Sequence, residues 1–311
     1  MIPAPFEYVR PSDMPGALRI LKEHEGEAKV LSGGYSLIPL LKLRLAQPPL
    51  LVDIGGLAGM DGITETGDEL VIGARATHRR IFQAEAVAAR YPLLHDAAGG
   101  IGDPQVRNWG TIGGSCAHAD PSADWPAVLI ASRATLVCRS QGGERRIAAR
   151  EFFLDTFVTA IEPTEILTEV RIPRSGERSG GAYEKIERKA GDFATAASAV
   201  QLSLGADGHI EQVGVGLTAV AETAFAATDA EHVLAGAMPS EAVFRQAGAA
   251  AAAQSRPSAD GHGPVEYKRA RAAEMTDRAL RRAVARALGQ DAHGPVGHGA
   301  AGHGAAGHGA A

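Results

Sequence analysis

Short blocks of hydrophobic and polar residues alternate along the first part of the chain. Apolar positions at helical spacing predict a helix over 17–22 and an amphipathic helix over 38–45. Short apolar runs predict strands at 29–31 and 50–54. The order strand, glycine-containing turn, helix, strand is typical of a βαβ unit, so we expect residues 1–57 to form a small α/β subdomain.

The pattern over residues 58–175 predicts a second α/β subdomain. Its expected strands are 69–74, 134–139 and 165–172, and its expected helices are 81–89 and 93–98. A loop over 99–103 leads to a polar stretch. The segment 120–124 has the composition of a helix start, with Asp or Ser as the cap and Pro in the first turn.

A Gly- and Ser-rich segment, 174–181, predicts a linker to a third unit over residues 182–288. Strand-like runs at 194–204 and 210–220, joined by a Gly-Ala-Asp-Gly turn, predict a hairpin, and two helices are expected at 239–253 and 265–288. The many arginines of the last helix indicate a solvated face or, alternatively, a docking surface.

From residue 289 the chain contains mostly Gly, Ala and His, so we expect residues 289–311 to be a disordered tail without a core. The repeat Gly-His-Gly-Ala-Ala places His298, His303 and His308 five residues apart. These histidines lack the Cys or carboxylate neighbours of a specific metal site, and we predict no metal site on this chain.

Composition limits the function classes. With 311 residues, 45% hydrophobic and 22% charged, the chain is typical of a globular protein of two or three domains. A net charge of -5 gives no reason to expect a nucleic-acid partner. No apolar run reaches the ~18 residues of a membrane span, and the N-terminus has no signal-peptide pattern. We therefore expect a cytoplasmic protein, which could still join a complex at the inner face of the membrane.

The chain has two cysteines, Cys116 and Cys138, without CxxC spacing. A [2Fe–2S] cluster takes four protein ligands, mostly Cys, so this chain alone cannot supply a cluster site. The two residues are expected to be free buried thiols.

Two glycine segments carry the candidate chemistry. They are Ser32-Gly33-Gly34-Tyr35-Ser36 and Thr111-Ile112-Gly113-Gly114-Ser115. Such turns can direct several backbone N–H groups at one anion, so the pair could hold the diphosphate of a dinucleotide from two sides. Lys29, three residues upstream of the first segment, is a suitable counter-charge. The alternative is that these turns only join elements of the fold.

The second glycine segment lies in a long polar stretch that suggests ligand contact. Asp124 in this stretch could accept a hydrogen bond from a ribose hydroxyl, or could be a helix-capping carboxylate. No G-x-G-x-x-G fingerprint, P-loop, G-x-S-x-G elbow or HExxH motif occurs. The chain offers no convincing nucleophile, so a cofactor must carry any redox chemistry.

Long blocks of the sequence resemble a known family. They include SGGYSLIPLLKLRLAQP (32–48), DPQVRNWGTIGGS (103–115), ADPSADWPA (119–127), AYEKIERKAGDFATAA (182–197) and DGHGPVEYKR (260–269). Over residues 1–288 the chain resembles the FAD-binding medium subunits of the molybdenum hydroxylase (xanthine dehydrogenase) family, and most closely those of the aerobic carbon monoxide dehydrogenase type.

The resemblance implies an α+β fold: a two-part FAD-binding domain of the vanillyl-alcohol-oxidase (PCMH) type followed by a smaller α+β domain. It implies no catalytic side chain, because FAD carries the redox chemistry. The cofactor-binding residues that it implies are Lys29, Ser32, Gly33, Gly34, Tyr35, Ser36, Leu37, Thr111, Ile112, Gly113, Gly114, Ser115, Asp124, Leu167, Lys185 and Phe193. Phe193 falls where an aromatic or aliphatic residue lies against the isoalloxazine.

The resemblance also implies partners. A large subunit would carry molybdenum-cytosine dinucleotide and a small subunit two [2Fe–2S] clusters, in a dimer of heterotrimers. Electrons would pass through FAD to an external acceptor, a quinone or a carrier protein. Carbon monoxide dehydrogenases often carry His at the position of Tyr35 and Tyr at that of Phe193. These departures weaken the carbon monoxide assignment and leave open the flavin subunit of a hydroxylase for purines, N-heterocycles or aldehydes. Two alternatives from other classes are a self-contained flavin oxidase and a nucleotide-binding module without redox function.

Overall fold

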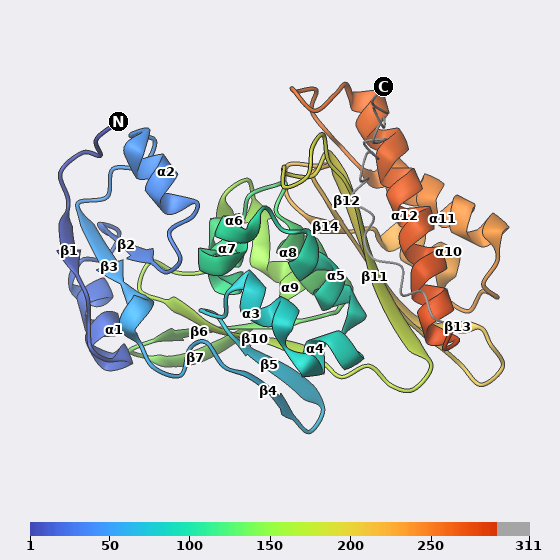
Figure 1. The fold of residues 1–311 in the computed structure, drawn as a ribbon, viewed down its shortest axis with the longest axis horizontal. Coiled ribbons are helices and arrows are strands. Elements are labelled where there is room, and N and C mark those ends of the chain that lie inside the picture. Colours follow the sequence, from blue (N-terminus) through green and yellow to red (C-terminus); the bar gives the residue numbers. More distant parts are fainter. Residues whose placement is uncertain (291–311) are drawn as a thin grey trace, which may run out of the picture.

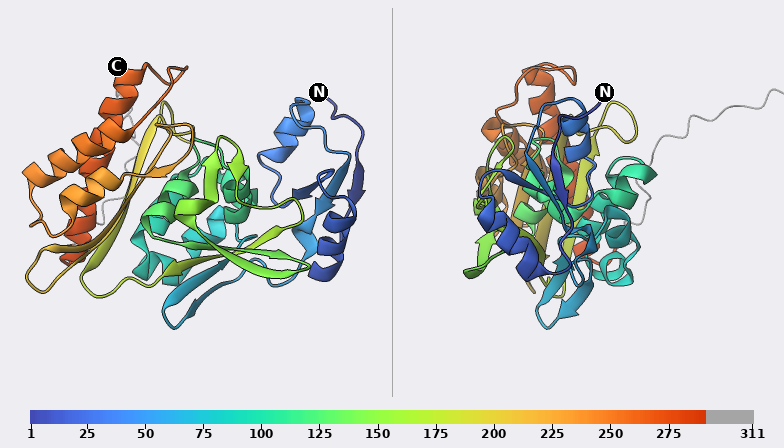
Figure 2. Two further views of the ribbon diagram at one scale, coloured as in Figure 1. Left: turned by 180° about the vertical axis from the view of Figure 1, so that it is seen from behind. Right: turned by 90° about the vertical axis from the view of Figure 1, so that its left-hand side faces the viewer.

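The structure, a computed structural model, describes residues 1–290 as three units that follow one another along the long axis of the molecule (Figure 1). Each unit has its own sheet, and the view from behind shows the N-terminal and C-terminal units at opposite ends (Figure 2). The mixture of helices and sheets confirms the predicted α+β class. The tail prediction concerns residues that lie almost entirely outside the described range.

The first unit is a three-stranded parallel sheet with strand order β1-β3-β2. Its elements are β1 (Glu7–Val9), α1 (Met14–Glu23), β2 (Ala28–Leu31), α2 (Leu37–Lys42) and β3 (Leu50–Asp53), followed by a 3-10 turn at Ile54–Gly56. Since β2, α2 and β3 form a parallel crossover, the predicted βαβ unit is confirmed. Helix α2 is shorter than expected because Arg44, with a φ of +57°, leaves the helical region.

The second unit has a five-stranded antiparallel sheet with strand order β4-β5-β10-β6-β7. The strands are β4 (Ile63–Thr66), β5 (Glu69–Gly73), β6 (Thr135–Ser140), β7 (Gly143–Ala148) and β10 (Ile166–Pro173). A small hairpin, β8 (Phe153–Asp155) and β9 (Val158–Thr159), lies apart from this sheet. The helices are α3 (His78–Gln83), α4 (Glu85–Arg90), α5 (Pro92–Gly100), α6 (Pro104–Trp109), α7 (Ile112–His118), α8 (Asp124–Ala131) and α9 (Ala149–Phe152).

Three local predictions in this unit were wrong. The helix expected over 81–89 is two helices, because Ala84 is extended. The loop expected over 99–103 is shorter, because α5 continues to Gly100, and the polar stretch that follows is helix α6, capped by Asp103. Helix α8 begins at Asp124 rather than near Asp120, whose carboxylate instead accepts the Ser122 N–H at 2.8 Å in a local turn.

The third unit is a four-stranded antiparallel sheet in the order β11-β12-β13-β14 with three helices. Its elements are β11 (Ser179–Ile186), β12 (Ala196–Leu204), β13 (Ile210–Thr218), β14 (Phe225–Ala226), α10 (Thr228–Leu234), α11 (Glu241–Gln254) and α12 (Val265–Ala287). The predicted hairpin is the β12–β13 pair. No helix within residues 1–290 is both long enough and apolar enough to cross a membrane.

Close backbone contacts join the second and third units. Helix α8 is buried along its whole length and packs on β13. A Cβ atom at Gly214 or Gly216 would lie 2.0 or 2.1 Å from a carbonyl oxygen of α8, so only glycine fits there. Within the third unit, Gly180 of β11 lies against α12, with its Cβ position 2.0 Å from the Ala283 carbonyl oxygen. The expected linker is therefore shorter than predicted, and its last glycines serve packing.

Two arginines of α12 form a partly buried ionic contact with the second unit, so the solvated-face prediction is wrong for them. Arg286 donates to the Asp96 carboxylate of α5 at 2.6 Å, and Arg282 donates to it at 3.1 Å. Arg282 also pairs with Glu184 of β11. In contrast, Arg278 forms an exposed pair with Glu274 on the same helix, as expected of a solvated face.

Candidate functional site

The two glycine segments, far apart in the sequence, lie against each other. The Ser32 and Thr111 hydroxyl oxygens are 3.2 Å apart. A Cβ atom on Gly33 would lie 2.0 Å from the Trp109 carbonyl oxygen and 3.4 Å from the Gly110 Cα. Glycine at position 33 therefore allows the first and second units to meet at this point.

The first glycine segment offers free backbone donors. The backbone N–H groups of residues 33–37 donate no hydrogen bond to any residue within the range 1–290. Gly34 has a φ of +79°, the left-handed conformation that glycine favours. Helix α2 begins immediately afterwards, and the Ser36 side chain does not cap it. A run of N–H groups before a helix can bind an anion such as a phosphate.

The second glycine segment is the first turn of α7 rather than an open turn. Thr111 is the helix cap, and its hydroxyl accepts the Gly114 N–H at 3.1 Å. The N–H groups of Ile112, Gly113 and Ser115 donate to the carbonyls of Ala76, Ala74 and Thr111. The expectation of a second set of free N–H groups is therefore wrong over residues 112–115. This segment can offer the Thr111 N–H and the half-exposed Ser115 hydroxyl.

Buried His78 supports the second segment from behind. Its backbone N–H donates to the Gly110 carbonyl at 3.0 Å, and its Nδ1 accepts the Trp125 indole N–H at 3.0 Å. Burial, with a smaller contribution from the Arg107 charge, lowers the pKa of His78 to about 4. The imidazole is therefore neutral at physiological pH. Sequence reasoning missed this residue.

A buried polar cluster joins α8 to β11 of the third unit. It consists of Asp124, Tyr183, Lys185 and Glu187. The Tyr183 hydroxyl donates to Asp124 Oδ1 at 2.6 Å, and Lys185 Nζ lies 3.3 Å from the same oxygen and 3.1 Å from Glu187 Oε2. Asp124 and Lys185, both expected to bind the cofactor, thus lie together although 61 residues separate them.

Electrostatics in this cluster favour charged Lys185 and neutral Tyr183. Burial by itself lowers the pKa of Lys185, but the Asp124 and Glu187 carboxylates outweigh it and raise this pKa overall. Burial, followed by the Asp124 charge, raises the pKa of Tyr183 well above its ordinary value. Tyr183 therefore remains a hydrogen-bond donor. The period-2 spacing of Tyr183 and Lys185 on one strand was a signal that the sequence contained.

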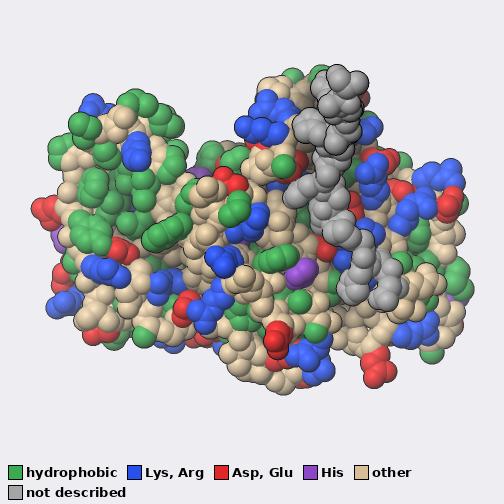
Figure 3. Space-filling model, viewed as in Figure 1, with side chains coloured by type: hydrophobic (Ala, Val, Ile, Leu, Met, Phe, Trp, Pro, Cys, Tyr) green, Lys and Arg blue, Asp and Glu red, His purple; other side chains and the backbone are tan. Residues whose placement is uncertain are grey.

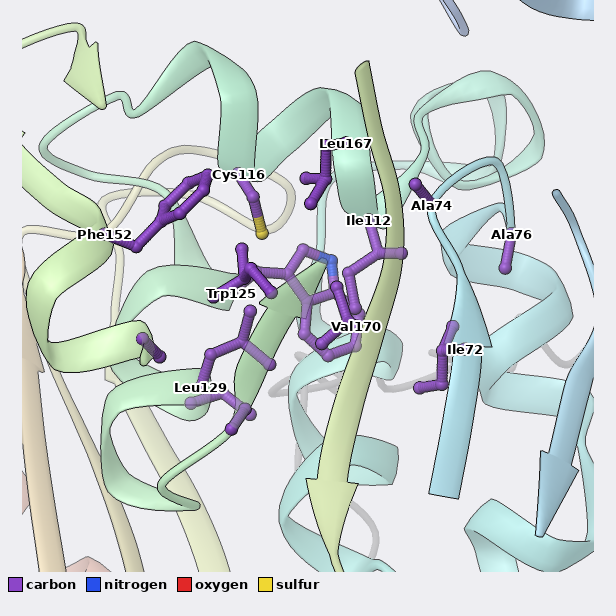
Figure 4. Packing of buried hydrophobic residues seen from close by; sticks show 14 of the residues in the cluster. Ile72, Ala74, Ala76, Ile112, Cys116, Trp125, Leu129, Phe152, Leu167 and Val170 are labelled. Carbon is purple, nitrogen blue, oxygen red and sulfur yellow. The ribbon is translucent and has the colours of Figure 1, made fainter. Parts of the chain in front are cut away.

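Ile112 and Leu167 have side chains in the apolar core, beside Cys116 and Trp125 (Figure 4). Ile112 is fully buried and Leu167 only 6% exposed, so these residues offer a ligand mainly their backbone groups. Burial raises the pKa of the Cys116 thiol, which makes it unreactive. No group of three or more His, Cys, Asp or Glu side chains that could hold a metal occurs within the described range.

The other expected residues line the surface near these segments. Lys29 is exposed on the edge strand β2. Burial lowers the pKa of His118 at the end of α7, and the Lys29 charge adds a smaller effect in the same direction. Tyr35 is 41% and Phe193 51% exposed. Phe193 belongs to the β11–β12 connection, where the Cβ position of Gly191 is 3.4 Å from the backbone of Gly102. The second and third units thus approach each other beside Phe193.

Two family models cover nearly all of the chain. Residues 4–175 match the FAD binding domain in molybdopterin dehydrogenase, and residues 181–283 match the CO dehydrogenase flavoprotein C-terminal domain. These two matches support the resemblance drawn from the sequence.

Several known proteins are similar to this chain over almost their whole length. The carbon monoxide dehydrogenase medium chain of Afipia carboxidovorans is 41% identical, over 92% of this chain and 99% of that protein. The 6-hydroxypseudooxynicotine dehydrogenase complex subunit alpha of Paenarthrobacter nicotinovorans is 34% identical, over 92% and 97%. A chain in the solved structure of carbon monoxide dehydrogenase from Hydrogenophaga pseudoflava has a TM-score of 0.89 and 43% identity, over 92% and 99%.

Proposed function

Because the chain belongs to the family of FAD-binding flavoprotein subunits of molybdopterin dehydrogenases, we propose that it is the electron-transfer subunit of a molybdenum- and iron–sulfur-containing hydroxylase of the carbon monoxide dehydrogenase type. Two observations together carry this proposal. The chain is similar to a carbon monoxide dehydrogenase medium chain over almost its whole length, and Ser32 contacts Thr111. That contact brings both glycine segments to one place.

The residues present fit FAD. The free N–H groups of residues 33–37 suit its diphosphate, and Thr111 and Ser115 add a donor and a hydroxyl from the facing segment. Asp124 suits a ribose or ribityl hydroxyl, and Lys29, Tyr35, Leu167, Lys185 and Phe193 complete the proposed set. When bound, FAD supplies the ability to accept electrons singly and to pass on two. This chain's own task is to bind and orient it.

The chemistry on the substrate falls to partner subunits in this proposal. Cys116 and Cys138 are both buried and cannot form a four-ligand cluster site. We therefore assign the molybdenum-cytosine dinucleotide to a large subunit and two [2Fe–2S] clusters to a small one, in a dimer of heterotrimers. A quinone or carrier protein would be the final acceptor, and the complex would be cytoplasmic or attached to the inner face of the membrane.

Exposed apolar side chains support membership in a complex. They gather over α2 and the N-terminal segment (Figure 3) and include Ile2, Ile38, Leu43 and Leu45. A monomeric protein rarely leaves such side chains together in water, so this surface suits a partner subunit.

The test is purification of the tagged full chain from its own cells. We expect one FAD per chain, co-purifying large and small subunits with molybdenum and iron, and bleaching of the flavin absorption when carbon monoxide is added. A pure chain that stays colourless after incubation with FAD would refute the proposal. Turnover of an organic substrate by the isolated chain would favour a flavin oxidase instead.

A second candidate is the flavin subunit of a hydroxylase for another substrate. Tyr35 and Phe193 favour it, and the 34% identity to the 6-hydroxypseudooxynicotine dehydrogenase subunit shows that relatives include subunits of such complexes. Bleaching of the flavin by an N-heterocycle, a purine or an aldehyde, but not by carbon monoxide, would select this candidate.

A further inference from the structure

We infer that Tyr183 is a positioning residue of the cofactor site, which holds the Asp124 carboxylate in the orientation that FAD requires. The inference rests on the proposed function, since it assumes that Asp124 contacts FAD. It adds a residue from the C-terminal unit that neither sequence patterns nor the family resemblance assigned to the site.

The geometry directs two donors at one oxygen of Asp124. The Tyr183 hydroxyl, 2.6 Å away, and the Lys185 ammonium, 3.3 Å away, both face Oδ1. The other oxygen, Oδ2, receives no hydrogen bond from any residue in the range 1–290. Although Asp124 is only 6% exposed as a residue, Oδ2 is not fully enclosed. This oxygen is therefore open to a hydrogen bond from a ligand hydroxyl.

Lys185 cannot replace Tyr183 in this role, because its contact with Asp124 is an ion pair without hydrogen-bond geometry. Nζ donates a hydrogen bond to the Gly100 carbonyl at 3.2 Å and lies 3.3 Å from Asp124 Oδ1 and 3.1 Å from Glu187 Oε2. Glu187 Oε2 receives no hydrogen bond from any residue in the range 1–290. Lys185 therefore neutralises charge in the cluster, whereas the directional bond that orients Asp124 comes from Tyr183.

The same carboxylate is linked to the second glycine segment. Asp124 is the first residue of α8, and the next residue, Trp125, donates to His78 Nδ1. His78 in turn donates its backbone N–H to the Gly110 carbonyl, directly before Thr111. The position of Asp124 is thus fixed from one side by this chain of contacts and from the other side by Tyr183.

A double-mutant cycle tests the inference on the full-length chain stripped of FAD. The variants are Tyr183→Phe, Asp124→Asn and the double variant, with FAD affinity measured by quenching of flavin fluorescence. The matched control is Tyr91→Phe, which removes another buried tyrosine hydroxyl, 3.4 Å from Glu65. We expect Tyr183→Phe to weaken FAD binding about tenfold, the control less than about twofold, and the double variant no more than Asp124→Asn alone.

The pH profile gives a second readout. Burial raises the pKa of Asp124, and the Lys185 charge and the Tyr183 hydrogen bond oppose this rise in part. Removing the hydroxyl should raise that pKa, so affinity should begin to fall at a higher pH in Tyr183→Phe than in the wild type. This shift should be absent in the Asp124→Asn background. Removing a residue that only supported the fold would not change the pH at which FAD affinity begins to fall.

Three results would overturn the inference. Tyr183→Phe could bind FAD as tightly as the wild type, or its tenfold loss could persist in the Asp124→Asn background. The FAD-free variant could also be unfolded, in which case Tyr183 would be holding the two units together. Failure of the wild-type chain to bind FAD is a different result, which would refute the proposed function itself.

Discussion

Mildly acidic solution should weaken the fold, because buried His78 resists protonation in the folded chain. The imidazole is 4% exposed, accepts the Trp125 indole N–H and is held neutral. Its pKa in the folded chain, about 4, is below the ordinary 6.5. As the pH falls through 6.5, the unfolded chain takes up a proton at this residue and the folded chain does not. The stabilisation is therefore complete above pH 6.5 and is lost progressively down to about pH 4.

The size of the effect follows from the two pKa values. A fall in the pKa of His78 from 6.5 to about 4 corresponds to a loss of about 2 kcal/mol of unfolding free energy between pH 7.5 and pH 5, and about 3 kcal/mol at the acid limit. Domains are stable by roughly 5–15 kcal/mol, so such a loss is readily measured.

His78→Asn isolates this contribution, because the Asn side-chain oxygen can still accept from Trp125 but does not titrate. Urea unfolding of the wild type and the variant, followed by tryptophan fluorescence at several pH values, gives the two free energies. We expect the wild type to lose about 2 kcal/mol more than the variant between pH 7.5 and pH 5. Equal losses in both proteins would refute the assignment of His78 as a neutral buried histidine.

Three further predictions concern packing and charge. Gly33→Ala places a Cβ 2.0 Å from a carbonyl oxygen, so FAD affinity should fall about tenfold or more in a fluorescence titration. Gly180→Ala meets the Ala283 carbonyl oxygen at 2.0 Å, which should cost about 1–3 kcal/mol of unfolding free energy in urea. Asp96→Asn leaves two arginines of α12 without their shared carboxylate, so thermal and urea unfolding should reveal a loss of about 3 kcal/mol.

Matched variants control for the substitutions themselves. Gly62→Ala and Gly176→Ala add a methyl group where no atom lies within 4 Å, so neither should change affinity or stability. If Gly33→Ala bound FAD as well as Gly62→Ala, close contact between the two segments would be unimportant. Unchanged stability of Gly180→Ala or Asp96→Asn would show that α12 does not depend on these contacts.

The family and most elements were accessible from the sequence, because they depend on local pattern. The βαβ order of the first unit and the β12–β13 hairpin were both predicted correctly, since turn chemistry and apolar periodicity are short-range signals. Errors arose where tertiary contacts compete with local preference. Gly180 looked like part of a flexible linker, yet it is a strand residue that admits α12.

The sequence alone determined which residue types are available: two glycine segments, an acidic residue at 124, and Tyr183 and Lys185 two residues apart. Only the tertiary structure decided how they combine. It brought Ser32 to Thr111, occupied the N–H groups of the second segment, and used Tyr183 and Lys185 to hold one oxygen of Asp124. The physical reason is that partners distant along the chain are selected by the packing of whole elements, which no local pattern encodes.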